Sequence, residues 1–173
     1  MELLELMLSR RSIRKFTEEK VSPGDLDVIL KAGLSAPSGR NIKPVEFVVV
    51  EDRKTILALE TCKDYGAGPL HEAPLAIAVI GDREKSDIWV EDCSLAAMQI
   101  QLAVTDLGLG SCWIHIRQRR QGERWAEEAA REILGLPERF GVVCLLAIGH
   151  PAEEKPAYSP AELDFGRVRR ERD

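Results

Sequence analysis

Three guanidinium groups and a hydroxyl stand close together near the start of the chain, in the run Arg10-Arg11-Ser12-Ile13-Arg14. Arginine forks match the oxygens of a phosphate in pairs, and a serine hydroxyl adds a neutral hydrogen bond. These residue types at this spacing indicate a phosphate site. A solvated basic turn explains the same charges, and charge alone favours that alternative.

A polar loop framed by prolines comes next, with the sequence Ala36-Pro37-Ser38-Gly39-Arg40-Asn41-Ile42-Lys43-Pro44. Ser38 and Asn41 offer both hydrogen-bond donors and acceptors, so this loop could read the polar edge of a planar heterocycle. An ordinary connection between a helix and a strand remains the alternative.

A third segment, Gly108-Leu109-Gly110-Ser111-Cys112-Trp113-Ile114, has two glycines at its start. Glycines let backbone amides approach a ligand closely. The alternative is the end of a helix that leads directly into a strand.

No nucleophile and base are arranged as a triad in this sequence. The histidines, His71, His115 and His150, are interpreted as structural, and we expect no catalytic side chain. No GxGxxG run follows an expected strand, so a Rossmann nucleotide site is not indicated. The cysteines show no CxxC or Cys/His ligand spacing, which favours buried free thiols over a metal site or a disulfide framework. They are Cys62, Cys93, Cys112 and Cys144.

Composition indicates a soluble, globular chain of one domain, residues 1–173. Hydrophobic residues make up 45% and charged residues 31%, and the net charge of −5 does not favour a nucleic-acid partner. The start, Met1–Ser9, lacks the basic region of a signal peptide. The stretch Cys93–Thr105 is too short to span a bilayer. We therefore expect a cytoplasmic protein with no membrane partner.

Hydrophobic spacing predicts helices alternating with strands. Ser22 as N-cap and Pro23 at the first turn start one helix. A long helix, capped by Ser86 or Asp87, is expected to run to about Leu107, ended by Gly108 and Gly110. Further helices are expected around Leu3–Leu8 and Trp125–Leu134, and strands at Val45–Val50, Leu75–Ile80, Cys112–Ile116 and Val142–Gly149. This layout predicts a mixed sheet with helices on both sides.

Two features indicate a partner subunit. The long helix is apolar almost all round between Cys93 and Val104, so it must be covered on every side. The tail from Pro151 onward is polar and charged and cannot make a core of its own. A second copy of the chain is a natural source of cover for both.

The segments described above resemble, in this order, the FMN-dependent nitroreductase-like family over essentially the whole chain. The family's R-x-S-x-R-like run is matched by Arg10, Ser12 and Arg14, and its A-P-S-x-x-N-x-x-P loop by Ala36–Pro44. The run G-L-G-S-C-W-I is present as Gly108–Ile114, and a closing I-G-H-P-A-E-E-K as Ile148–Lys155.

The resemblance implies an α+β fold of three layers, α/β/α, with a mixed central sheet in an intertwined homodimer. It also implies bound FMN, with hydride passing from NAD(P)H through flavin N5 to a small oxidised acceptor such as a nitroaromatic or a quinone. The alternatives are a specialised flavin enzyme of the same fold, for dehalogenation, flavin fragmentation or enone reduction, and a flavin-binding carrier or sensor without turnover. The choice between NADH and NADPH stays open.

The resemblance also assigns cofactor-binding residues. Arg10, Arg11, Ser12 and Arg14 are expected at the FMN phosphate and ribityl chain, and Pro37, Ser38 and Asn41 at the flavin of the partner subunit. Trp113, Ile114 and His115 are expected to place backbone amides beside N5. Within the tail, residues 151–173, which we expect to dock on the partner, Arg167, or Arg169 as second choice, is expected to return to the phosphate.

The chain departs from the family's usual residues at three places. Lys43-Pro44-Val45 stands where Gln-Pro-Trp is common, Ile100 stands where the central helix often has Asn, and His115-Ile116 stands for Gly-Gly. These positions touch the pyrimidine edge, the central helix and the N5 face. They bear on substrate identity more than on flavin binding.

Overall fold

The computed structural model describes residues 2–171, and its first helices begin where local sequence signals place them. Helix α1 spans Leu3–Ser9 and α2 spans Pro23–Leu34. The Ser22 hydroxyl accepts a hydrogen bond from the Asp25 amide at 3.1 Å, which satisfies one of the free donors at the start of α2. The predicted cap of α2 is therefore confirmed.

A four-stranded sheet in the order β1-β2-β6-β3 forms the centre of the fold. Its strands are β1 (Val45–Val50), β2 (Leu75–Asp82), β3 (Gly110–His115) and β6 (Phe140–Gly149). The two middle strands, β2 and β6, are buried along their whole length, as their uninterrupted apolar runs require.

The pairings β1–β2, β2–β6 and β3–β6 are all antiparallel. Within residues 2–171, the parallel pairing is the isolated bridge between Ser12 and Ser111. The expectation of mixed strand directions therefore holds only at that bridge. Strand β6 lies between β2 and β3 in the sheet and runs antiparallel to both of them.

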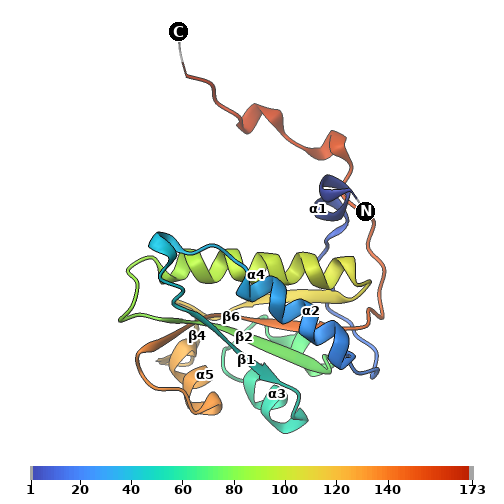
Figure 1. Ribbon diagram of the computed structural model, residues 1–173. Coiled ribbons are helices and arrows are strands. Elements are labelled where there is room, and N and C mark those ends of the chain that lie inside the picture. Colours follow the sequence, from blue (N-terminus) through green and yellow to red (C-terminus); the bar gives the residue numbers. More distant parts are fainter. Residues whose placement is uncertain (1, 172–173) are drawn as a thin grey trace.

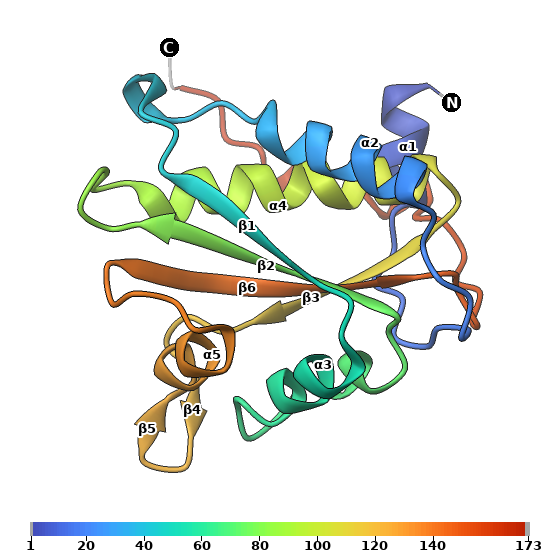
Figure 2. The ribbon, with the colours of Figure 1, turned by 60° about the horizontal axis from the view of Figure 1, so that its bottom comes forward.

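Helices cover both faces of the sheet, which confirms the expected three layers (Figures 1 and 2). Helices α2 and α4 (Trp89–Asp106) lie on one face, where Ile29 and Ile100 belong to one hydrophobic cluster. Helices α3 (Arg53–Glu60) and α5 (Ala126–Leu134) lie on the other, where Ile56 and Ala130 belong to a second cluster.

The predicted N-cap of the long helix, Ser86 or Asp87, is wrong by one to two residues. Helix α4 begins at Trp89, and its N-cap, Ile88, provides no side-chain cap. The Ser86 hydroxyl instead accepts from the Ile88 amide at 3.3 Å, so it stabilises the turn before the helix. At the other end Gly108 has φ +74° and ends the helix as expected, whereas Gly110 already belongs to β3.

Several elements were not predicted from the sequence. Helix α3 is capped by Asp52, which accepts from the Thr55 amide at 2.9 Å. The strands β4 (Arg120–Gln121) and β5 (Arg124–Trp125) form a small hairpin. Short 3₁₀ turns are η1 (Gly39–Asn41), η2 (Gly68–His71), η3 (Pro160–Glu162) and η4 (Phe165–Arg167).

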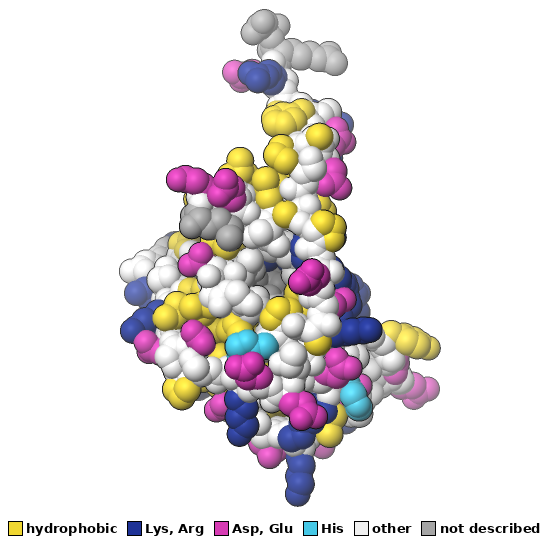
Figure 3. Space-filling model, turned by 90° about the vertical axis from the view of Figure 1, so that its right-hand side faces the viewer, with side chains coloured by type: hydrophobic (Ala, Val, Ile, Leu, Met, Phe, Trp, Pro, Cys, Tyr) yellow, Lys and Arg dark blue, Asp and Glu magenta, His cyan; other side chains and the backbone are white. Residues whose placement is uncertain are grey.

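The tail leaves the body beside α1 and runs away from it (Figure 1), and hydrophobic side chains lie exposed along it (Figure 3). Phe165 is 76% exposed and Val168 61% exposed. On α1, Leu3 and Leu4 are 63% and 60% exposed. Arg172, the last arginine of the tail, lies outside the described residues. These apolar surfaces have no cover in this chain.

Candidate functional site at the outer edge of β3

The arginine run and the glycine-led segment meet at the outer edge of β3, an edge strand of the sheet. Ser12 and Ser111 form the parallel bridge, and the Ile13 amide donates to the Ser111 carbonyl at 2.9 Å. A Cβ on Gly110 would come within 2.8 Å of the Ile13 side chain, so glycine permits this close approach. The Gln101 side-chain amide of α4 donates to the buried Ser111 hydroxyl at 3.3 Å.

The closing motif completes this edge with a lysine. The Lys155 Nζ donates to the Ser12 carbonyl at 2.6 Å and lies 3.2 Å from a carboxylate oxygen of Glu153. The same carboxylate accepts from the Arg14 amide at 2.5 Å. Lys155 was not among the predicted site residues, although its place in the closing motif was the signal that could have found it.

Three cations act on one thiol at the start of β3. Burial raises the pKa of Cys112, the positive charges of Arg14, Lys155 and Arg10 oppose that rise, and the carboxylate of Glu153 adds to it. Three cations and one carboxylate therefore lie near Cys112. Cations gathered in this way can meet the charge of a dianionic phosphate.

Arg11 has a different role in this chain. Its guanidinium donates to the Pro156 carbonyl and lies 4.3 Å from the centre of the Tyr158 ring. These contacts hold the beginning of the tail against the end of α1, where the Tyr158 amide donates to the Leu8 carbonyl at 3.0 Å. The structure therefore gives Arg11 a packing role beside the cation cluster.

Further along β3, the backbone of Trp113 and His115 faces the same outer edge as Ser111. In a β-strand the N–H and C=O groups of one residue point to one side, and alternate residues share that side. Ile114 between them points its backbone to β6, where it pairs with Leu145. The backbone edge offered to a ligand thus comes from Trp113 and His115, while Ile114 contributes its buried side chain to the core.

The rings of Trp113 and His115 stack with their centres 6.3 Å apart, and the indole N–H donates to His115 Nδ1 at 3.4 Å. That bond requires a lone pair on Nδ1. Burial lowers the pKa of His115, and the positive charges of Arg119, Lys63 and Arg117 lower it further. The imidazole is consequently neutral at pH 7.

The polar loop has an unusual backbone that several contacts hold in place. Arg40, Asn41 and Lys43 have φ of 53°, 56° and 54°, a region that residues other than glycine rarely adopt. The Ser38 hydroxyl accepts from the Lys43 amide at 2.8 Å. The Gly39 amide donates to a carboxylate oxygen of the buried Asp92 at 2.9 Å, which ties the loop to α4. Pro37 and Ser38 line a small cavity of about 70 Å³.

This loop and the arginine run lie at opposite ends of α4. The loop contacts Asp92 in the first turn, whereas the arginine run reaches β3 just after the helix ends. An 18-residue helix is about 27 Å long, so one chain does not bring Ser38 and Asn41 to its own cations. Their role at the site of a partner subunit stays a prediction.

Arg167 and Arg169 lie on the exposed tail, which runs away from the body (Figure 1). The start of the tail contacts residues 11–14 through Glu153, Lys155 and Pro156. Arg167 and Arg169 lie further along, on the part that runs away from the body, and their contact with a phosphate stays a prediction.

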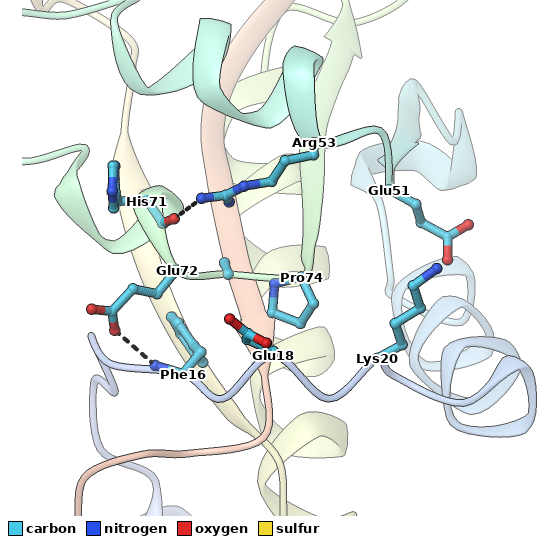
Figure 4. Close-up of a pocket in the computed structure, with 9 residues that line it drawn as sticks. Phe16, Glu18, Lys20, Glu51, Arg53, His71, Glu72 and Pro74 are labelled. Carbon is cyan, nitrogen blue, oxygen red and sulfur yellow. Dashed lines mark hydrogen bonds between the residues drawn. The ribbon is translucent and has the colours of Figure 1, made fainter.

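A separate cavity of about 610 Å³ lies between the segment after Phe16 and the start of α3 (Figure 4). Two of its polar groups have partners: Arg53 donates to the carbonyls of Leu70 and His71, and Glu72 accepts from the Phe16 amide at 3.3 Å. None of the predicted cofactor-binding residues lines it. Within residues 2–171 no group of acids, histidines and cysteines could hold a metal ion, and no helix is long and apolar enough to cross a membrane.

The fold and the cation-lined strand edge define a cofactor-binding protein of α+β class, and comparison with known proteins gives its family. The family model described as "Nitroreductase family" matches residues 7–67 and 58–150. The chain belongs to the nitroreductase family, which confirms the resemblance drawn from its motifs.

Individual relatives match over nearly the full length. A protein from Archaeoglobus fulgidus, whose name refers to NADH dehydrogenase and NAD(P)H nitroreductase, is 36% identical over 176 residues, covering 99% of this chain and 98% of the relative. An FMN-dependent nitroreductase from Clostridium difficile R20291 superposes with a TM-score of 0.96 at 42% identity, covering 99% and 100%. A nitroreductase from Bacteroides fragilis with bound FMN superposes with a TM-score of 0.78 at 26% identity, covering 99% and 100%.

Proposed function

We propose that this protein is an FMN-dependent oxidoreductase that passes hydride from NAD(P)H to a small oxidised acceptor, such as a nitroaromatic or a quinone. One observation carries the proposal. Cations gather around Cys112 at the start of the outer edge of β3, and the backbone of Trp113 and His115 faces the same edge a few residues on. Three residues of strand span about 10 Å, so both features fit a single elongated cofactor.

The residues present fit FMN in their chemistry. Its phosphate requires several cations at one point, and Arg10, Arg14 and Lys155 meet that need. Its planar ring requires donors and acceptors along one line, which the free edge of a strand provides. The names of the relatives support the choice, because structures from Bacteroides fragilis and Desulfovibrio desulfuricans contain FMN.

Bound FMN would supply the redox chemistry, by taking up a hydride from NAD(P)H and giving it to the acceptor. The chain's own residues would bind the cofactor and orient its ring. Arg10, Arg14 and Lys155 neutralise the phosphate, and the amides of Trp113 and His115 fix the ring edge without needing to move. Because the His115 ring is neutral, the positive charge at this end of β3 comes from Arg119, Lys63 and Arg117.

A homodimer would complete the site. The exposed apolar residues of α1 and of the tail need a surface to cover them. The loop of Ser38 and Asn41 lies at the opposite end of α4 from the arginine run of the same chain, so it cannot contact a cofactor bound at that run. We infer that the tail docks on the partner and that each loop serves the partner's flavin. The four cysteines are free and buried, which supports a reducing, cytoplasmic location.

Flavin analysis tests this proposal. The protein is purified without added flavin and heated, and the released cofactor is separated by chromatography. FMN is the expected result, and FAD or a failure to bind any flavin would contradict the proposal. Turnover with nitroaromatics and quinones then separates an oxidoreductase from a carrier or sensor that only binds the flavin. Turnover restricted to a haloaromatic or an enone would indicate one of the specialised enzymes.

A further inference from the structure

One backbone group on the outer edge of β3 is already bound by a lysine from a distant segment. The Lys63 Nζ donates to the His115 carbonyl at 2.8 Å. The N–H and C=O groups of one strand residue point to the same side, so the ammonium lies at the edge that also presents the His115 amide. A strand residue spans about 3.3 Å, so a ligand atom bonded to that amide would lie within several ångströms of the Lys63 ammonium.

The turn after α3 holds Lys63 in this position. Cys62, before it, is fully buried, and the amide of Asp64, after it, donates to the Arg120 carbonyl at 2.9 Å. An Asp64 carboxylate oxygen accepts from the Gly122 amide at 2.9 Å, which joins the turn to the β4–β5 hairpin. Because both neighbours of Lys63 are fixed, the fold itself places this ammonium beside β3.

Lys63 carries its positive charge without an ion-pair partner among residues 2–171. By contrast, Lys155 near the start of β3 lies 3.2 Å from a carboxylate oxygen of Glu153. Burial lowers the pKa of Lys63, and the positive charge of Arg119 lowers it further. A partly buried cation without a counter-charge interacts strongly with negative charge that develops beside it.

We propose that Lys63 belongs to the flavin site and that its charge raises the reduction potential of the bound flavin. The inference rests on the proposed function, because that function places the flavin ring along the edge shared by His115 and Lys63. A hydride that reaches N5 brings two electrons, so the ring gains one negative charge while the donor leaves as NAD(P)⁺. Lys63 keeps its proton throughout and stabilises the added charge. Its hydrogen bond to the His115 carbonyl keeps the ammonium beside the ring.

Three substitutions at this position separate the charge from the hydrogen bond. Lys63→Gln keeps a donor for the His115 carbonyl but removes the charge. Lys63→Met removes both, and Lys63→Arg keeps both. Lys54→Gln is the matched control, because Lys54 is exposed on α3 and its loss changes the net charge by the same amount.

The midpoint potential of FMN bound to each protein is measured against a redox dye. Xanthine and xanthine oxidase supply the electrons, so the measurement needs no nicotinamide. We expect Lys63→Gln and Lys63→Met to lower the potential by about 30 mV, a tenfold loss of preference for the reduced flavin in a two-electron couple. Lys63→Arg should restore most of the wild-type value, and Lys54→Gln should keep it. The affinity for oxidised FMN should change little, because the oxidised ring is uncharged.

A potential that stays at the wild-type value in Lys63→Gln overturns the inference. So does a potential that falls in Lys63→Met alone, because that result assigns the effect to the hydrogen bond. A lower melting temperature without a shift in potential would make Lys63 an anchor of the turn and would also overturn it.

The same proteins distinguish a failure of this inference from a failure of the proposed function. The expected shift in potential, in protein that neither NADH nor NADPH reduces, would support the role of Lys63 and overturn the proposed function. Reduction by a nicotinamide without any effect of Lys63 on the potential would do the reverse. Protein that binds no flavin would overturn both.

Discussion

Ser12 and Ser111, 99 positions apart in the sequence, are joined by a parallel bridge that lays the arginine run along the outer edge of β3. The bridge brings together the arginine run and the glycine-led segment, each of which has a purely structural explanation when taken alone. One supplies cations and the other supplies a strand edge with free backbone groups.

Substitution of Arg10 or Arg14 by glutamine should weaken FMN binding by about 1.5–3 kcal/mol, the scale of a hydrogen bond to a charged group. Riboflavin, which lacks the phosphate, should bind wild type and both variants alike. Calorimetric titration of apo-protein with each flavin measures this. Arg11→Gln is the matched control, because Arg11 contacts Pro156 and Tyr158. Equal loss of FMN and riboflavin affinity would remove both arginines from the phosphate site.

Substitution of Gly110 by alanine should separate the two strand-like segments. The new Cβ would lie 2.8 Å from Ile13 side-chain atoms, so the backbone of residues 12–13 must shift, at a cost of about 1–3 kcal/mol. Urea unfolding and FMN affinity should both decrease. Gly68→Ala serves as control, since nothing lies within 4 Å of its added Cβ. Unchanged FMN affinity in Gly110→Ala would show that the bridge does not position the site.

Truncation after Asp164 should weaken the dimer and FMN retention together. It removes Phe165, Val168 and both candidate tail arginines, and Phe165 is 76% exposed within one chain. Sedimentation velocity and the melting temperature check this, and excess FMN should partly restore the melting temperature by mass action. Arg167→Ala and Arg169→Ala, measured separately, identify which arginine meets the phosphate. A wild-type protein that is a stable, FMN-loaded monomer at micromolar concentration would contradict the dimer.

Acid should destabilise the protein through His115. Its pKa in the fold lies below the ordinary histidine value of 6.5, because burial and then Arg119, Lys63 and Arg117 disfavour the charged ring. Between the two values the unfolded chain binds more protons, so the free energy of unfolding falls as the pH drops through that window. His115→Gln should remove this part of the pH dependence, and Arg119→Gln should raise the His115 pKa in an NMR titration. An unshifted pKa in Arg119→Gln would place Arg119 away from the ring.

Removal of the Asp92 carboxylate should release the polar loop. One oxygen accepts from the Gly39 amide at 2.9 Å, and the other has no hydrogen-bond partner among the described residues. Asp92→Ala should lower the free energy of unfolding by about 1–3 kcal/mol, while Asp92→Asn, which keeps an acceptor, should cost less. Limited proteolysis should cut the loop of Arg40 and Asn41 faster in Asp92→Ala. An equal cutting rate would show that other contacts, such as Arg40 with Asp87, suffice.

Local signals were enough to predict the strands and most helices. Each of these features depends on only a few neighbouring residues: the apolar runs of β2 and β6, the Ser22 cap of α2, and the left-handed Gly135 that ends α5. The strand directions depend on how distant segments return to the sheet, which spacing does not determine. Helix α3 was missed because it buries only Ile56 and Leu59, too few positions for a clear period.

The candidate site was predictable where a motif names its own residues. Ser12 bridges Ser111 at the outer edge of β3, and contact of Arg10, Ser12 and Arg14 with the FMN phosphate stays a prediction. The position of Lys155 beside Ser12 depends on the pairing of residues 15–17 with 150–152, which only the fold creates. The contacts of Arg11 with Pro156 and Tyr158 likewise arise only in the fold, and its predicted place at the phosphate is untested.

Anaerobic titration of the FMN-loaded protein with NADH and with NADPH tests the central claim most directly. The account predicts that at least one nicotinamide bleaches the flavin absorbance completely and that a nitroaromatic or a quinone restores it. A flavin that stays oxidised with both nicotinamides, in protein shown to bind FMN, would contradict the account and leave a flavin-binding protein without this activity.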